Sequence, residues 1–490
     1  MKRQLALSFF AITGTIAGIA ITNSAPIASE IASDMSEALP AGDVSQLAHC
    51  VESDFVSTIF APGTDPKVVE RVSRAIENLN AGQRFQAGNR WPGADNTPVT
   101  ITYSFPADGI NVPNGVGEGA GPNDLNATLT GQFGSSSTWK NKFAQIFQAW
   151  EDITGNVYIE VSDDGAAMGS SGPLHGGSGR GDIRITGKSI DGNFGILAYN
   201  SFPGAGSGGD MVIDTDEFWA NSSQDFRFFR NTLSHEHGHG MGLFHVCPIT
   251  QSKLMEPFLS TAFDGPQHDD IRGATHHYGD FYEPNNNAAS AGFLASLNGP
   301  GSFPFVLDDM ALRDDADEDF YSFTIDGAGS LDVEVRIVGA VYENNPQDQA
   351  CAPQGSPFDS TARIDPDLAV LDTDGVTVLA SVDANGLSGN ESLTGVVLPA
   401  AGTYFMRVRP VNSPGVAQIY DLAGTVTIDV NMPVVCIADL NGDEIVDTAD
   451  LGILIGVFGT NSPLADLNDD NIVDTADLGI LIGVFGTCTE

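Results

Sequence analysis

The sequence T-L-S-H-E-H-G-H-G-M-G-L-F-H at residues 232–245 determines what is expected of the rest of the chain. His235 and His239 are four residues apart, so in a helix they lie on one face and can share a metal ion. Glu236 follows the first histidine and can stand beside the metal without binding it. That is the position of a general base that takes a proton from a metal-activated water.

Gly242 and His245 complete the spacing H-E-x-x-H-x-x-G-x-x-H. Glycine reaches positive φ at low cost, so the chain can leave the helix at Gly242 and return with His245 as a third ligand. Three imidazole nitrogens with an open fourth position are typical of a catalytic zinc site. The alternative is accidental spacing. His237 lies two residues from both helical ligands, so it should face away, as a surface residue or as a support behind the ligands.

The composition limits the possible classes of function. The chain has 490 residues, and its 64 acidic and 21 basic residues give a net charge of −43. This length is enough for about three domains. The charge argues against nucleic-acid binding, because phosphate contacts require clustered Lys and Arg. An acidic balance suits divalent cations, and the alternative is a generally acidic surface.

The N-terminal residues 1–28 have the pattern of a secretory signal peptide. Lys2 and Arg3 precede an apolar run that leads into small residues. A retained membrane anchor is the alternative, and no other segment of the sequence is expected to span a bilayer. Residues 29–63 carry no clear pattern and are expected to be a linker or a short pro-segment. The protein is therefore predicted to be secreted, and extracellular or associated with a cell surface.

Five cysteines are few, but an exported protein can form disulfides. Cys436 and Cys488 bracket the C-terminal repeat and are expected to pair. Three cysteines remain, so one of them is free or pairs elsewhere. Spacing does not decide the pairing among Cys50, Cys247 and Cys351.

Residues 64–280 alternate between helical and strand patterns. Helices are predicted from Asp65 to about Leu79, at 138–154 and at 227–242, where apolar residues recur on one face. Strands are predicted at 99–105, 157–161 and 182–186, and the glycine-rich stretch 192–216 contains two short apolar pieces at 196–198 and 211–213. This order predicts an α+β domain over a small mixed sheet.

Residues 91–279 resemble a metzincin metalloprotease and, within that group, the matrixins. The landmarks are W-E-D-I-T-G at 150–155, L-A-Y-N-S-F-P-G-A-G-S-G-G-D at 197–210, the zinc motif, and L-M-E-P at 254–257. Met255 is similar to the methionine that lies beneath the zinc ligands in that family, and it would be a core methionine in either case.

The resemblance also implies further metal sites. Five residues match the family's calcium ligands, three through carboxylates and two through backbone oxygens: Asp210, Asp214, Glu217, Gly206 and Gly208. The alternative is an ordinary acidic turn. Tyr199 and Val212 stand where the family has histidines for a structural zinc, so a single, catalytic zinc is expected.

Other features depart from the family or concern substrate binding. Cys50 does not lie in the family's pro-segment motif, so latency through a cysteine is not expected. By resemblance, substrate should lie extended along residues 196–198. Pro257 and Phe258 should wall the pocket for the side chain that follows the cut.

Residues 281–432 change to short alternating runs, which predict an all-β sandwich. The pieces E-P-N-N at 283–286, D-E-D-F-Y-S-F at 317–323 and G-T-Y-F-M-R-V at 402–408 resemble a bacterial pre-peptidase C-terminal domain. No catalytic set is found in it, so a role in stability or substrate binding is expected.

Residues 436–490 contain a repeat of period 27 that resembles the dockerin type I module. Each copy is an EF-hand-like loop followed by an apolar helix, which predicts a small α module that binds calcium. The expected ligands are Asp439, Asn441, Asp443, Asp447, Asp450, Asp466, Asn468, Asp470, Asp474 and Asp477. The sixth loop position, which usually takes glycine, holds Glu444 in the first copy and Asn471 in the second, and asparagine tolerates the left-handed conformation better than glutamate does. The alternative is a disordered acidic tail.

By the same resemblance, Thr448-Ala449 and Thr475-Ala476 lie where dockerins contact a cohesin partner. The whole sequence predicts a secreted zinc endopeptidase acting on extracellular proteins, with zinc and calcium as cofactors and a possible cohesin-like or cell-surface partner. The competing hypothesis is a calcium-dependent adhesion or scaffold protein whose protease domain is vestigial.

Overall fold

The structure is a computed structural model that describes residues 56–64, 90–170, 179–204, 206–347, 351–412, 417–428, 438–443, 445–468 and 470–487. These residues belong to one compact unit, Leu47–Glu490. The predicted signal peptide, the helix expected from Asp65, Cys50, and the expected pair Cys436 and Cys488 lie outside the described residues.

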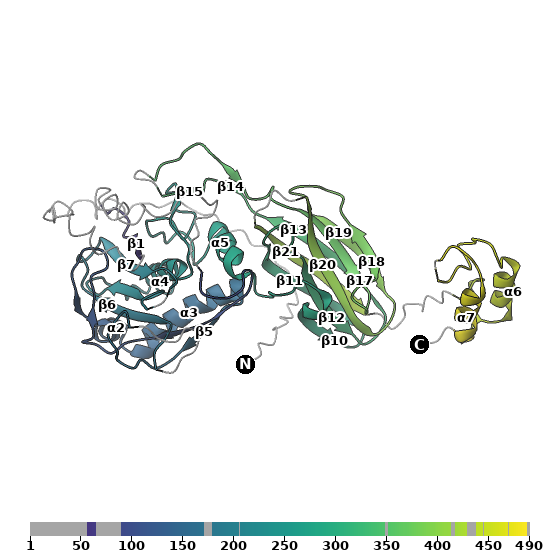
Figure 1. Cartoon of the computed structure of the whole chain (residues 1–490), viewed down its shortest axis with the longest axis horizontal. Helices are drawn as coiled ribbons and strands as arrows, with labels where there is room; N and C mark the ends of the chain where they lie inside the picture. The colour runs from purple at the N-terminus through teal and green to yellow at the C-terminus, as the bar shows by residue number, and fades with distance from the viewer. Residues whose placement is uncertain are drawn as a thin grey trace, which may run out of the picture. The chain divides into compact units, whose positions relative to one another are not determined.

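A six-stranded mixed sheet forms the base of the first domain (Figure 1). Its order is β1 (Val56–Phe60), β7 (Ile196–Ser201), β8 (Met211–Asp214), β6 (Ile183–Lys188), β2 (Thr100–Ser104) and β5 (Val157–Glu160). The strands β8, β6, β2 and β5 run parallel to one another, whereas β7 is antiparallel to β8 and β1 is antiparallel to β7. β1 is therefore the edge strand of the sheet, next to β7.

Four described helices accompany this sheet: α2 (Leu125–Phe133), α3 (Ser136–Thr154), α4 (Arg227–Gly240) and α5 (His268–Tyr278). Ser135 caps α3 by accepting a hydrogen bond from the Thr138 amide, and Gly155 ends the helix with φ of +67°. The apolar side of α3, which includes Trp139 and Trp150, is fully buried in a core shared with α4 and the sheet. The expected helices at 138–154 and 227–242 are thus present within two residues, while α2 and α5 were not predicted.

The second domain is a β-sandwich of two sheets. One sheet has the order β10 (Gly292–Leu297), β12 (Asp319–Ile325), β20 (Gly402–Asn412), β17 (Asp365–Leu371) and β18 (Val378–Val382). The other has the order β11 (Gly301–Leu312), β21 (Gln418–Ile428), β13 (Gly329–Val338) and β19 (Glu391–Leu398). Inward-facing residues of both sheets form one apolar core.

An arm of the sandwich reaches the zinc-motif region of the first domain. The arm comprises residues 341–347 and 351–359, with β14 (Val341–Tyr342) paired to β16 (Phe358–Asp359). Its strand β15 (Asn345–Pro346) pairs antiparallel with β9 (Val246–Cys247), which directly follows His245. A disulfide between Cys247 and Cys351 fixes the same contact and settles the pairing that spacing left open.

The C-terminal repeat contains two matching helices, α6 (Thr448–Gly456) and α7 (Thr475–Gly483). Asp447 and Asp474 cap them, each in a capping box completed by an aspartate three residues later. The short strands β22 (Ile445–Val446) and β23 (Gly486–Thr487) pair antiparallel and join the two copies. Asn471 has φ of +67°, as expected for its loop position.

Among the described residues, the structure contains no helix with the length and apolar character needed to cross a membrane.

Candidate metal and catalytic site

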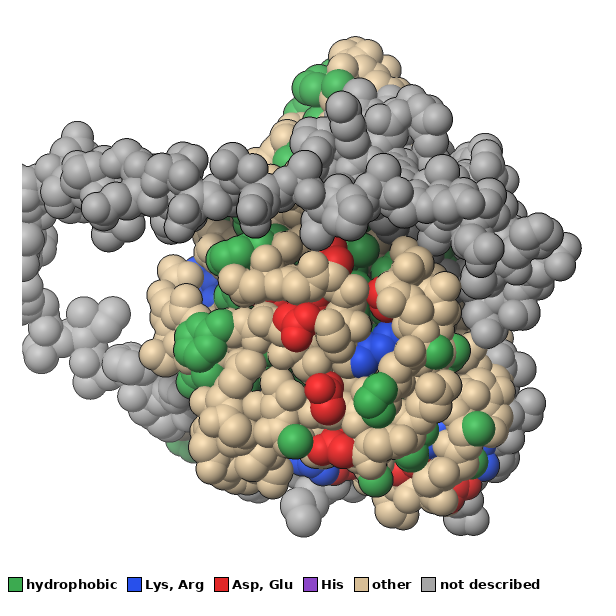
Figure 2. All heavy atoms as spheres, turned by 90° about the vertical axis from the view of Figure 1, so that its left-hand side faces the viewer, with side chains coloured by type: hydrophobic (Ala, Val, Ile, Leu, Met, Phe, Trp, Pro, Cys, Tyr) green, Lys and Arg blue, Asp and Glu red, His purple; other side chains and the backbone are tan. Residues whose placement is uncertain are grey.

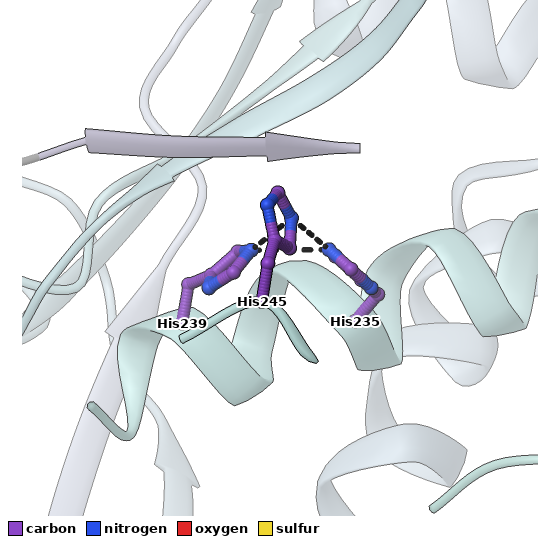
Figure 3. Close-up of side chains that lie close together, drawn as sticks. All are labelled: His235, His239 and His245. Atoms are coloured by element: carbon purple, nitrogen blue, oxygen red, sulfur yellow. Dashed lines mark hydrogen bonds between the residues drawn. The ribbon is translucent and has the colours of Figure 1, made fainter. Parts of the chain in front are cut away.

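Helix α4 and the turn after it bring three histidines together. His235 and His239 lie on α4, and Gly242 takes φ of +99° so that the chain turns back with His245 (Figure 3). The three Nε2 atoms lie 3.0, 3.1 and 3.2 Å from one another. All three side chains are buried, and His245, at 5%, is the most exposed of them.

The hydrogen bonds of the opposite ring nitrogens show that a cation fits this triad. His235 Nδ1 lies 2.6 Å from the Leu254 carbonyl, and His239 Nδ1 lies 2.7 Å from the Leu243 carbonyl. A carbonyl oxygen only accepts, so both Nδ1 atoms carry the proton and both Nε2 atoms present a lone pair. Converging lone pairs at about 3 Å repel one another unless a cation lies between them, and three imidazole nitrogens suit zinc.

Burial also keeps these imidazoles in the neutral form that binds metal. It lowers the pKa of His235 and His239 well below the usual value, and the neighbouring histidines add to the effect. The pKa of His245 is lowered to about 4 by burial, although hydrogen bonds with Gln347 and the Thr58 backbone oppose the shift. All three are therefore neutral at physiological pH.

Glu236 lies on the same helix and is fully buried. Its Oε1 accepts a hydrogen bond from the Ile59 amide at 3.0 Å, and its Oε2 has no partner among the described residues. Burial raises its pKa well above the usual value for a glutamate, which strengthens it as a base.

His237 and Met255 support the helix from behind the ligands. His237 is buried, and its Nε2 lies 2.8 Å from the Tyr158 hydroxyl, so it is not a surface residue. The Met255 sulfur packs so closely against Gly238 of α4 that a side chain there would clash with it. On the face drawn in Figure 2, the described residues show no histidine, in agreement with this burial.

The site includes two parts that sequence reasoning did not identify. One is β1, which crosses over the three imidazoles (Figure 3) and lies in the segment expected to be a linker or pro-segment. The other is Gln347 of the arm, whose Oε1 accepts from His245 Nδ1 at 2.5 Å. Both contacts join segments more than 100 residues apart, and no local pattern signals them.

The predicted calcium carboxylates separate into two places. Asp214 and Glu217 lie beside Asp191, and burial with mutual repulsion raises the pKa of Asp191 and Asp214 to about 6 and that of Glu217 to about 7. Asp210 stands at the opposite end of β8, about 13 Å along an extended strand, and its Oδ1 accepts from the Arg184 amide. The structure thus groups Asp191 with two of the three predicted residues, and leaves Asp210 out of the group. The signal that could have found Asp191 is the glycine-rich turn that follows it.

The position where the matrixins have a structural zinc is filled by another buried network. Tyr199 donates from its hydroxyl to Glu118 at 2.8 Å, and Glu118 forms an ion pair with Lys188 at 2.7 Å. Val212 is buried in the adjacent apolar cluster. A lysine ammonium therefore neutralises the carboxylate at this place.

In the C-terminal repeat, the two acidic loops fold around their last aspartate. Asp450 accepts hydrogen bonds from the amides of Leu440, Asn441 and Asp447. The second copy repeats this pattern through Asp477, with Leu467, Asn468 and Asp474 as donors.

In the first loop, oxygens of Asp439, Asp443 and Asp450 lie within 4.8 Å of one another, a grouping that could hold a cation. The neighbouring ligand positions form hydrogen bonds within each loop. The side-chain amides of Asn441 and Asn468 donate to Asp443 and Asp470, and the Asp470 backbone amide donates to Asp466.

A third carboxylate group lies in the sandwich and was not predicted. Oxygens of Glu283, Asp317 and Asp319, all buried, lie within 4.8 Å of one another. Burial, with the charges of Asp317 and Asp280, raises the pKa of Glu283 to about 8. These residues lie within the E-P-N-N and D-E-D-F-Y-S-F pieces, which carry the resemblance to a pre-peptidase C-terminal domain but do not by themselves indicate a carboxylate group.

The fold and the site define a zinc peptidase domain, and comparison with known families agrees. Residues 129–279 match the family model of the matrixins, the M10 peptidases, and residues 317–410 match that of the bacterial pre-peptidase C-terminal domain. The chain therefore contains a matrixin domain, which belongs to the zinc metalloendopeptidases, followed by a pre-peptidase C-terminal domain.

Similar proteins include several curated metalloproteinases. The chain is 37% identical to the interstitial collagenase of Bos taurus over 143 residues, which cover 29% of this chain and 28% of the relative. It is 34% identical to matrix metalloproteinase-18 of Xenopus laevis over 148 residues, again 29% of this chain and 28% of the relative. The chain thus spans less than a third of the length of these relatives.

One solved structure also aligns with the chain. It is the pre-peptidase C-terminal domain of a collagenase from Bacillus anthracis, with 14% identity, a TM-score of 0.14, and coverage of 27% of this chain and 94% of its own. A TM-score of that size carries no fold argument, so the assignment of the second domain rests on the family match at residues 317–410.

Proposed function

We propose that this protein is a secreted endopeptidase that hydrolyses peptide bonds of extracellular proteins. The observation that carries the proposal is the group of three buried histidines with convergent Nε2 atoms beside a buried glutamate. A binding protein needs no base at Glu236, so the intact glutamate disfavours the alternative of an adhesion protein with a vestigial protease domain.

His235, His239 and His245 would hold the zinc ion through Nε2. Zinc at such a site supplies a lowered pKa for a bound water and polarises the scissile carbonyl. Glu236 takes a proton from the attacking water, and its raised pKa suits this role. The same carboxyl then delivers the proton to the leaving amine nitrogen.

Backbone pairing along β7 would hold the substrate extended across the site. Without β1, β7 would be the edge strand of the sheet, and its residues Ile196 and Ala198 pair with Phe60 and Ile59 of β1. On the opposite side, Pro257 and Phe258 would line the pocket for the residue after the cut, and Phe258 packs against Phe60 at a ring distance of 6.1 Å.

Calcium binding is proposed for two regions. In the first domain, Asp191, Asp214 and Glu217 concentrate negative charge around a tight turn, and bound calcium would relieve the repulsion. In the C-terminal repeat, each loop presents several carboxylates over a short distance, which suits calcium.

We further propose that the C-terminal module docks to a partner of the cohesin kind. Apolar side chains remain exposed at matching positions of both copies, including Ile455 with Ile482 and Phe458 with Phe485. Paired exposed apolar residues on a small module favour a protein partner over solvent.

Cleavage of a peptide library by zinc-loaded protein, alongside Glu236→Ala, tests the proposed activity. The parent protein should cut peptides, and the variant should retain one zinc ion but lose cleavage. A parent protein that binds zinc and cuts nothing would support the adhesion hypothesis instead.

A further inference from the structure

The segment around β1 occupies the place that an extended substrate would take. β1 pairs antiparallel with β7 in the register Thr58 to Tyr199 and Ile59 to Ala198. On its other side, the Phe60 amide donates to the Pro257 carbonyl at 3.1 Å, and the Leu259 amide donates to the Phe60 carbonyl at 3.0 Å. The segment is therefore held by backbone hydrogen bonds on both sides, from β7 and from residues 257 and 259.

The peptide bond between Thr58 and Ile59 lies at the catalytic groups. The Ile59 amide donates to Glu236 Oε1 at 3.0 Å, and the preceding residue, Thr58, pairs with Tyr199 of β7. The nitrogen of this bond therefore faces the proposed general base, which directly follows the metal ligand His235 in the sequence. Hydrolysis requires this relation between a scissile bond and its catalytic groups.

The side chains of Thr58, Ile59 and Phe60 are fully buried. Ile59 is fully buried in the main apolar core of the domain, which also contains Leu233 of α4 and Met255. Phe60 is also fully buried and packs in a second cluster with Ile196. In addition, the Thr58 hydroxyl donates to the Ala198 carbonyl at 2.7 Å.

We propose that the Thr58–Ile59 bond is a cleavage site of the protein's own peptidase centre, so that Ile59 becomes a new N-terminus. This inference rests on the proposed peptidase function. One water is consumed: its oxygen enters the Thr58 carboxylate, the carbon–nitrogen bond to Ile59 breaks, and Glu236 delivers the proton that makes the Ile59 amine. The intact segment covers β7, so an external peptide has to displace it.

The first test follows the N-terminus of the full chain after zinc is added. Intact-mass measurement should find a fragment beginning at Ile59, and its rate of formation should not depend on protein concentration, because substrate and site belong to one chain. Ile59→Leu should still be cut there, since an apolar side chain continues to fill the pocket.

The second test does not depend on activity. In zinc-loaded Glu236→Gln protein, the Phe60 amide should exchange hydrogen at least about tenfold more slowly than in the same protein carrying Ile59→Asp, because a charge in the apolar core expels the strand. Pro62→Asp adds the same charge at an exposed position and should preserve the slow exchange. Circular dichroism and zinc content check that both variants remain folded.

The outcomes separate this inference from the proposed function. If the protein cuts library peptides while the Thr58–Ile59 bond stays intact, or if Ile59→Asp leaves the exchange at Phe60 unchanged, the inference is wrong and the peptidase function stands. If zinc-loaded protein cuts neither the library nor this bond, both fail.

Discussion

Gln347 offers the sharpest test of how the arm supports the metal site. The Nδ1 atoms of His235 and His239 donate to backbone carbonyls, which no substitution removes. His245 instead donates to the Gln347 side chain at 2.5 Å. Gln347→Ala therefore removes the orienting partner of one ligand and leaves the other two intact.

The expected size of the effect follows from the burial of this contact. Loss of a hydrogen bond to a metal-binding histidine typically weakens metal affinity about 10–100-fold, or about 1.4–2.7 kcal/mol. Because His245 is only 5% exposed, water replaces the lost acceptor poorly, and the effect should not fall below this range. Gln347→Glu should bind zinc at least as tightly as the parent, since a carboxylate accepts the same proton and makes the ring more basic.

Zinc competition against a chromogenic chelator at neutral pH measures these affinities. Gln354→Ala is the matched control, because it makes the same change at an exposed position of the same arm. Equal zinc affinity of Gln347→Ala and Gln354→Ala would refute the reasoning and would make the contact with His245 incidental.

Three further predictions concern the disulfide, the buried glutamate of the sandwich and calcium binding. Replacing Cys247 and Cys351 together by serine should lower the free energy of unfolding by about 2–5 kcal/mol, because the disulfide closes a loop of 104 residues; unchanged chemical denaturation would contradict this. In the folded state the pKa of Glu283 is raised to about 8. Protonation of Glu283 therefore stabilises the folded protein fully below about pH 4, and this stabilisation is lost as pH rises to about 8. The melting temperature of metal-free Glu283→Gln protein should therefore increase relative to that of the parent as pH rises across that range. A difference in melting temperature that does not change with pH would contradict the raised pKa of Glu283. Calcium should raise the helical signal of the full chain, and Asp450→Asn, which weakens the first loop, should require more calcium for half of the change; identical titrations of variant and parent would remove calcium from that loop.

The sequence predicts those parts of the site that depend on local geometry. His235 and His239 meet because a helix places residues four apart on one face, and Gly242 makes the turn because its φ of +99° suits glycine. The apolar face of α3 likewise follows from its 3.6-residue period. The comparisons with the matrixins and the pre-peptidase C-terminal domain confirm the class of both domains.

Contacts between distant segments could not be predicted in the same way. Gln347 reaches His245 across 102 residues, and Ile59 reaches Glu236 across 177. Residues 56–60 read as linker because five residues are too few for periodicity to separate an edge strand from a loop. The resemblance to the matrixins groups Asp210 with Asp214, yet the extended strand β8 separates the two residues.

Zinc titration of the metal-free protein, with peptide cleavage as the signal, tests the central claim most directly. Cleavage should rise in proportion to added zinc and stop rising at one ion per chain, while Glu236→Gln should bind the same single ion and cut at least about 100-fold more slowly. Cleavage without zinc, or a Glu236→Gln variant as active as the parent, would contradict the assignment of the three histidines and the glutamate.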